Sequence, residues 1–358
     1  MFILHSSNKT ENLVAHLTAV IENAPLTSPF EKEIFLIQSQ GMERWLSQQL
    51  ASHFKVWGNF QFLFPDKFFS SLAQKIDSSL NDATFDRNLM LWRIEALLRR
   101  LDSNDFLPLK QYLSGENSSL KRYQLARQLA QIFDQYQIMR PDMLTAWQKA
   151  LWLQITVQTG NKHRGSLWRD VIAKFNTAKE GTFSQSLPER ISVFGINTMP
   201  PLFLSFLEGL SKHCQLHLFL LNPAQTFWAD LASKRQRTND GNFTGHPLLS
   251  TLGQQGREFQ EMLLEQVQFD FEPESFELSE ASDNLHQLQN DILNNRLNGP
   301  GEMSLIGSLQ KDDSISIHAC HSRMREVEVI KNQLLLTLEN DLTLELRDIV
   351  VMAPDIQV

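Results

Sequence analysis

The stretch that decides the fold is MFILHSSNKTENLVAHLTAVI, residues 1–21. It opens with a short apolar run that indicates a strand, breaks at the polar residues 5–8, and then repeats apolar side chains at helical spacing over 11–21. The order recurs at once, because EIFLIQS (33–39) predicts a strand and GMERWLSQQLASHF (41–54) a helix. Short apolar strands that alternate with amphipathic helices predict an α/β fold built on a parallel sheet.

The pattern changes in the middle of the chain, where long amphipathic helices such as SLKRYQLARQLAQIFDQY (119–136) follow one another without a recognisable strand. Strands return at RISVFGI (190–196) and QLHLFLL (215–221). A last strand–helix–strand pattern spans SISIHAC (314–320), a helix over 322–340 and DIVVMAPD. We therefore predict four parts: the first part of an α/β domain (1–80), an all-helical insertion (81–182), the α/β domain continued (183–300), and the start of a further, truncated βαβ unit (301–358).

Composition favours a globular cytoplasmic protein, with 42% hydrophobic and 21% charged residues and only two cysteines, too few for a disulfide framework. No apolar run approaches the ~18 residues that a membrane span needs. The net charge is −8, which argues against a nucleic-acid partner on composition alone. However, residues 86–178 hold 14 Lys and Arg against 8 Asp and Glu, so one basic segment lies within acidic surroundings. A local basic patch can attract a polyanion.

Lys9 and Thr10 after a strand suggest the end of a nucleotide-phosphate loop, G-x-x-x-x-G-K-[ST]. In that alignment Ile3 and Asn8 replace the two glycines that let the backbone wrap phosphates. An NTPase also needs an acid after a later strand to hold Mg²⁺, and the segment that follows RISVFGI offers Asn197 and no carboxylate. The layout is that of an NTPase, but we expect no ATP binding in this chain.

Other catalytic patterns also fail. His318 and Cys320 of HACH (318–321) share one face of a strand, but no second Cys/His cluster accompanies them, so we expect no metal site. Neither cysteine has a histidine partner that the spacing suggests, and G-x-S-x-G is absent. The carboxylates of DSNDF and KDDS are typical of solvated turns. We predict no catalytic residue, no cofactor and no metal in this chain.

The loop of IQSQGMERW (37–45) is more informative. It places Gln38, Ser39 and Gln40 between the end of a strand and the start of a helix, where ligands of α/β sheets bind. Glutamine and serine side chains can pair with base edges or phosphate oxygens. The alternative is that these residues only cap the following helix.

Four blocks, PFEKEIFLIQSQGMERWLSQQLASHF, IFDQYQIMRPDML, VFGINTMPP and the final ISIHACHSRMREVEVI with LRDIVVMAPDI, resemble the N-terminal part of the RecC family, the gamma chains of exodeoxyribonuclease V. The resemblance runs from end to end and implies a superfamily 1 helicase-like, P-loop NTPase-like fold that has lost its ATPase motifs. It implies a scaffold that holds RecB-like and RecD-like subunits, which would carry ATP and Mg²⁺. It also implies that the protein splits duplex DNA and scans the 3′-ended strand for the recombination hotspot Chi.

The resemblance further implies a set of Chi-reading residues. Those that match the enteric pattern of the family are Gln38, Asp134, Gln135, Arg140 and Arg164, and those that depart from it are Gln40, Arg44, Phe64, Ser70, Gln131 and Ile132. Side chains with other donors and sizes read other bases, so we expect a hotspot different from the enteric octamer. Ile132 also fits the apolar face of its helix, and Phe64 can either stack on a base or pack. Two further hypotheses remain: a pure protein-interaction scaffold, and an active helicase or nuclease.

Overall fold

The computed structural model describes residues 1–77, 86–101, 104–139, 146–157, 163–179, 181–183, 185–228, 245–272, 274–280, 283–296 and 312–353. The chain divides into two compact units. Met1–Leu278 and Asn290–Leu297 form the first unit, and Ser279–Gln289 and Asn298–Val358 form the second. The sheet and all of the proposed reader positions belong to the first unit.

The first unit is built on a six-stranded sheet in the order β3-β2-β4-β5-β1-β6, in which every neighbouring pair is parallel. Its strands are β1 (Phe2–Ser7), β2 (Glu33–Leu36), β3 (Phe60–Leu63), β4 (Arg190–Phe194), β5 (Gln215–Leu221) and β6 (Asp270–Phe271). All residues of β1 and β4 are buried, which explains the continuous apolar runs in the sequence. The α/β class and the parallel sheet are therefore confirmed.

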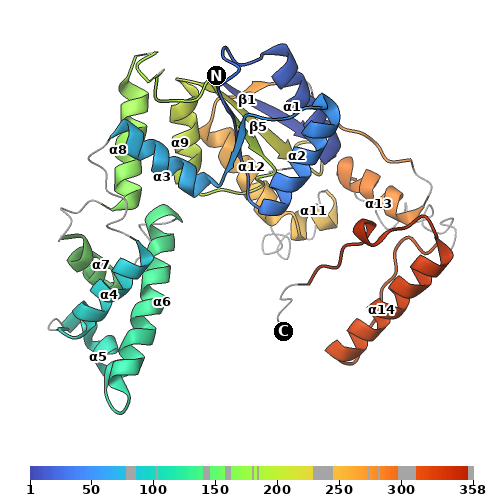
Figure 1. Ribbon diagram of the computed structural model, residues 1–358. Helices are drawn as coiled ribbons and strands as arrows, with labels where there is room; N and C mark the ends of the chain where they lie inside the picture. The colour runs from blue at the N-terminus through green and yellow to red at the C-terminus, as the bar shows by residue number, and fades with distance from the viewer. Residues whose placement is uncertain are drawn as a thin grey trace. The chain divides into compact units, whose positions relative to one another are not determined.

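Helices cover both faces of this sheet (Figure 1). On one face, α1 (Thr10–Asn23) and α2 (Gln40–Phe54) enclose a core with Leu17, Leu46 and Phe194. On the other, α3 (Pro65–Ile76), α8 (Arg164–Thr177), α9 (Pro201–Ser211) and α12 (Gln254–Gln266) enclose a larger core with Phe69 and Trp168. The short α11 (Pro247–Thr251) also belongs to the first unit, whereas α13 (Asn284–Leu293) begins in residues assigned to the second unit and ends in residues assigned to the first.

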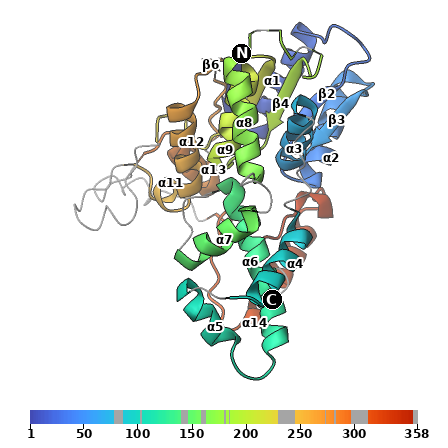
Figure 2. The ribbon, with the colours of Figure 1, turned by 90° about the vertical axis from the view of Figure 1, so that its left-hand side faces the viewer.

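A separate hydrophobic core holds the helices between β3 and β4 together. It is formed by α4 (Arg87–Leu98), η2 (Asn104–Phe106), α5 (Leu107–Leu113), α6 (Ser118–Met139) and α7 (Ala146–Val157). Buried residues such as Ile94, Phe133 and Leu151 form this core. Figure 2 shows these helices gathered at one end of the first unit, whereas α8 packs into the core of the sheet.

The start of the chain differs from the prediction. We expected a strand over residues 1–4 and a loop from His5, but β1 continues to Ser7. Ser6 and Ser7 pair with Leu220 and Leu221 of β5. Nε2 of His5 lies 3.0 Å from Nδ1 of His217 within the sheet. Because residues 5–7 pair with β5 in register with the rest of β1, the polarity of their side chains does not end the strand.

The second unit contains α14 (Arg323–Asn340), as predicted, and the short η5 (Leu346–Asp348). The strands predicted at 314–320 and over DIVVMAPD are wrong for the described residues, because 314–320 and 349–353 are assigned to no strand there. A strand needs a hydrogen-bonded neighbour, and no described segment pairs with either one. The apolar pattern alone therefore overpredicted strands in this unit.

Candidate nucleic-acid interface

The loop after β1 is fastened to a distant segment of the first unit. Oγ of Ser7 donates to the carbonyl of Ser275, and Nδ2 of Asn8 donates to the carbonyl of Glu277. Nζ of Lys9 lies 2.8 Å from the Glu277 carboxylate. The lysine that would serve a phosphate loop is thus paired with an acid of its own chain.

A hollow of about 470 Å³ lies where β1, β4 and β5 end, the place where parallel α/β sheets bind ligands. Its polar lining includes Asn8, Gln38, Asn197 and Thr198, and no described residue that lines it is charged. A nucleoside triphosphate with Mg²⁺ needs cations and carboxylates around it. The hollow therefore suits an uncharged polar group better than a nucleotide.

The turn after β4 fixes one wall of this hollow. Gly195 has φ +67°, and a Cβ added there would lie 2.8 Å from Cε of Met42 in α2. The positive φ favours glycine, because other residues are strained there, and any added Cβ would also require the terminal methyl of Met42 to move. The turn leads to Thr198, whose carbonyl accepts a hydrogen bond of 3.3 Å from Nε2 of Gln38. The side-chain carbonyl of Gln38 is consequently available as an acceptor.

The loop from β2 into α2 both caps the helix and presents polar side chains. Oγ of Ser39 accepts a hydrogen bond from the backbone N–H of Met42, which is a helix N-cap. Gln38, Gln40 and Arg44 are exposed, and the last two share a helix face because they are four residues apart. Capping therefore involves Ser39 and leaves three of the predicted residues accessible.

Arg164, at the start of α8, joins three elements. Its Nη2 lies 2.5 Å from Asp66 and 3.3 Å from Oγ of Ser70, both on α3, and its Nη1 lies 3.7 Å from Asp134 on α6. The guanidinium also lies over the ring of Trp168, 5.2 Å from its centre. We name Arg164, Asp66, Ser70 and Asp134 the arginine cluster. With one guanidinium between two carboxylates it has no surplus positive charge, so it suits base edges better than phosphates.

The histidine next to Arg164, His163, adds no positive charge to the arginine cluster. Burial, together with the charge of Arg169, lowers the pKa of His163 to about 4. This imidazole is therefore neutral at physiological pH and adds no positive charge. Its role is local, because its backbone N–H donates to Oγ of Ser166 at the start of α8.

The other predicted residues have less defined surroundings. Gln131 and Gln135 are exposed on α6, and Ile132 and Phe64 are half-buried. Phe64 precedes α3 directly after β3, and the backbone N–H of Ile37 donates to the carbonyl of Leu63. Gln38 and Phe64 thus follow neighbouring, hydrogen-bonded strand ends. Arg140 lies outside the described residues.

The comparisons with known proteins agree with one another. The family described as RecC, N-terminal domain, matches residues 2–295. The chain belongs to the RecC family. It is 31% identical to the RecBCD enzyme subunit RecC of Escherichia coli K12 over 99% of this chain, and 30% identical to that of Haemophilus influenzae, also over 99%. The RecC of Mycolicibacterium smegmatis is 31% identical over the same share. The chain spans 37%, 38% and 33% of these relatives' lengths.

The described residues contain no group of three or more His, Cys, Asp or Glu side chains placed to hold a metal ion. Among the helices that the structure describes, none has the length and apolar character needed to cross a membrane.

Sequence reasoning from the RecC resemblance named three members of the arginine cluster and missed Asp66. The acid lies in the first turn of α3, directly after Pro65 and four residues before Ser70. That spacing places Asp66 and Ser70 on one helix face. The available signal was therefore the helical period within α3.

Proposed function

We propose that this chain is a non-catalytic, DNA-scanning part of a RecC subunit, with a degenerate helicase-like fold. In this proposal the subunit works in a RecBCD-type complex during double-strand break repair and recombination, and reads the 3′-ended single strand for a Chi hotspot. The observation that carries the proposal is the polar array at the ends of β2 and β3. This array comprises exposed Gln38, Gln40 and Arg44 after β2 and, on α3 after β3, Asp66 and Ser70 of the arginine cluster, which contact Arg164.

The hollow at the strand ends supports the non-catalytic half of the proposal. Its described lining offers amide and hydroxyl groups and neither a cation nor a carboxylate. Lys9, the residue best placed to replace a phosphate-loop lysine, is paired with Glu277. ATP and Mg²⁺ would then act on the RecB-like and RecD-like partners.

Base-edge chemistry supports the reading half. Amide side chains that both donate and accept hydrogen bonds discriminate bases, and each good pair is worth about 1–3 kcal/mol. Gln38 already donates to Thr198 through its amide nitrogen, so its oxygen is left to accept from a base amino group. Six of the eleven reader positions depart from the enteric pattern, so we propose that the sequence read is different.

The test uses the chain in its full-length subunit, assembled with both partner subunits. Gln38→Ala and Arg164→Ala are expected to abolish the response to the hotspot while duplex unwinding continues at the rate of the unaltered complex. Lys110→Ala, an exposed lysine on α5, is the matched control. A normal hotspot response in both variants would refute the reader assignment, and ATP turnover by the subunit without its partners would refute the non-catalytic half.

The rival function is a protein scaffold that does not contact DNA. Affinity for single-stranded DNA as a function of salt separates the two, because each phosphate contact adds about 0.7 to the negative slope. A steep negative slope supports the DNA-scanning proposal. A flat response in the assembled complex would favour the pure scaffold.

A further inference from the structure

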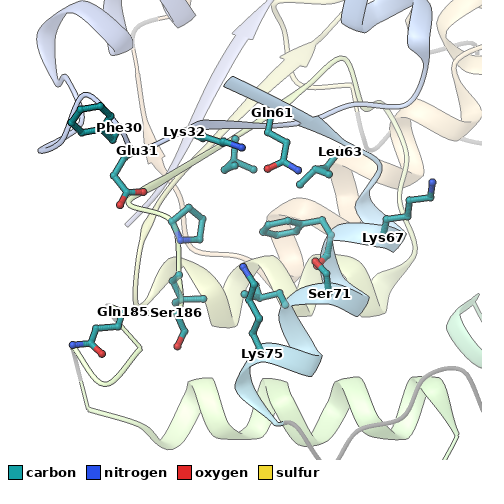
Figure 3. A pocket seen from close by; sticks show the side chains of 15 residues that line it. Phe30, Glu31, Lys32, Gln61, Leu63, Lys67, Ser71, Lys75, Gln185 and Ser186 are labelled. Carbon is teal, nitrogen blue, oxygen red and sulfur yellow. The ribbon is translucent and has the colours of Figure 1, made fainter. Parts of the chain in front are cut away.

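A second hollow, of about 790 Å³, lies between the sheet and α3. We name it the lysine hollow. Ile34 of β2 and Gln61 and Leu63 of β3 line it, whereas the alternate residues of both strands pack into the core on the other face of the sheet. The lysine hollow is therefore on the α3 side of these strands and inward of the free edge of β3. Figure 3 shows Gln61 and Lys75 of α3 pointing toward one another across it, with Lys67 at its rim.

The lysine hollow extends to the ends at which the strands begin. Lys32 directly precedes β2, and residues 185–188 lie shortly before β4. Lys75, in the last turn of α3, lines the hollow with them. The predicted reader positions Gln38 and Phe64 instead follow the ends of β2 and β3. The hollow therefore extends away from the reader positions, and its occupant need not be the strand that they would read.

The lysine hollow carries an excess of positive charge. Lys32, Lys67 and Lys75 are exposed and line it against one carboxylate, that of Glu31. In the part of the chain that the structure describes, none of these three lysines is ion-paired with an acid, although other lysines of the first unit, such as Lys174, are. The excess of positive charge favours an anionic occupant.

The lysine hollow also offers apolar surface. Ile34, Leu63 and Leu187 line it and are partly buried against the core under α3. Aliphatic side chains of this kind can receive an apolar side chain, whereas nucleobases stack on aromatic rings. Phe30, which also lines the hollow, is 89% exposed, and exposed aromatic side chains are typical of protein-binding surfaces. The combination of lysines and aliphatic side chains therefore suits a peptide that carries both carboxylates and an apolar side chain.

We propose that the lysine hollow binds an acidic segment of a partner protein, which inserts an apolar side chain between the sheet and α3. Carboxylates on either side of this apolar side chain meet Lys32 and Lys75, and the amide of Gln61 can bond with the backbone of the segment. The aliphatic lining and the distance from the reader positions favour a peptide over DNA. Phe30 could also stack on a base, an alternative that the test separates. This inference does not rest on the DNA-reading proposal.

The probe is a short fluorescent peptide in which a leucine lies between two pairs of glutamates. Binding to the full-length subunit, free of partner subunits, is followed by fluorescence anisotropy at low salt. The double variant Lys32→Glu with Lys75→Glu is expected to weaken binding about tenfold or more. The control double variant Lys110→Glu with Lys149→Glu changes the net charge equally at exposed lysines outside the hollow, and should change affinity by less than about twofold. A thermal melt of each variant checks that it is folded.

Two altered peptides sharpen the test. A peptide with lysine in place of glutamate should bind the Lys32→Glu, Lys75→Glu variant better than the unaltered subunit, because the charges are exchanged on both sides. A peptide with glycine in place of leucine should bind the unaltered subunit about tenfold more weakly, because it buries no apolar side chain.

Three results would overturn the proposal. The first is that the original peptide does not bind the unaltered subunit, and the second is that it binds the Lys32→Glu, Lys75→Glu variant equally well. The third is tighter binding of an oligo(dT) of about 15 nucleotides, lost in the same double variant, which would instead make the lysine hollow a nucleic-acid site.

Discussion

Two arginines of the first unit meet carboxylates in opposite settings. Arg190 of β4, 1% exposed, pairs with Glu33 of β2, 10% exposed, and also donates to two backbone carbonyls of the α1 region. Arg164 is 14% exposed, but its partners Asp66 and Asp134 are 47% and 34% exposed. One ion pair is closed to solvent, and the other is open to it.

The difference in exposure indicates that the Arg190–Glu33 pair stabilises the fold, whereas the arginine cluster can bind a ligand. A buried pair has lost its water and depends on its partner, so removing one member leaves a stranded charge. An open cluster keeps part of its hydration, so its partners tolerate the loss of one member. The open cluster can also exchange water for a base edge. We therefore expect stability to respond to Arg190 and binding to respond to Arg164.

The largest effect is expected for Arg190→Met. The change leaves the Glu33 carboxylate buried and unpaired, and should lower the free energy of unfolding by about 3–5 kcal/mol. Urea denaturation measures it. The double variant with Glu33→Leu removes the stranded charge and should recover much of the loss. A double variant no more stable than Arg190→Met alone would show that the ion pair is not the cause.

A smaller effect is expected from two buried imidazoles that have no counter-charge. Burial is the main cause that lowers the pKa of His5 to about 3 and that of His217 to about 4. In the unfolded chain these imidazoles have the ordinary histidine pKa of 6.5 and take up protons below that pH, whereas in the folded chain they stay neutral. The contribution of the neutral imidazoles to stability is therefore fully present above pH 6.5 and is lost as the pH decreases. Each imidazole should lower the free energy of unfolding by about 1 kcal/mol as the pH decreases from about 6.5 to 5.5.

The measurement is urea denaturation at several pH values in that range. His217→Leu removes one of three imidazoles whose pKa is lowered to about 3 or 4, those of His5, His163 and His217, and should reduce the slope of stability against pH by up to about a third. A slope unchanged by this substitution would assign the acid sensitivity to other groups.

The sequence predicted the elements whose pattern is long and apolar. β5 was expected over residues 215–221 and has these bounds, and the helix expected over residues 41–54 is α2, which begins one residue earlier. Two strands escaped prediction. β3 has four residues, and β6 has two that become a strand only by pairing with Ile3 and Leu4 of β1. Short strands depend on a tertiary neighbour, which local periodicity does not encode.

The site was accessible to sequence reasoning only in part. The loop of Gln38 and Gln40 follows from the strand–loop–helix pattern, because strand ends are where α/β sheets present polar groups. The contact of Arg164 with Asp66 joins residues 98 positions apart, and no spacing rule links them. The lysine hollow of about 790 Å³ was not predicted, because Lys32 and Lys75 line the same hollow only after β2 and α3 are packed.

The smallest effect on stability, and the sharpest test of the comparison, is expected for Arg164→Met. Asp66 and Asp134 can rehydrate when the guanidinium is removed, so the free energy of unfolding should fall by about 1 kcal/mol or less. Discrimination between hotspot and non-hotspot single strands, measured with the assembled complex, should fall by about 1–3 kcal/mol if Arg164 or the groups it orients read a base. Arg164→Lys, which keeps the charge but not the fork that reaches both α3 and α6, should lose discrimination with an unchanged melting temperature. A loss of stability as large as that of Arg190→Met would place Arg164 with the closed pair and remove the basis for treating the arginine cluster as a reader.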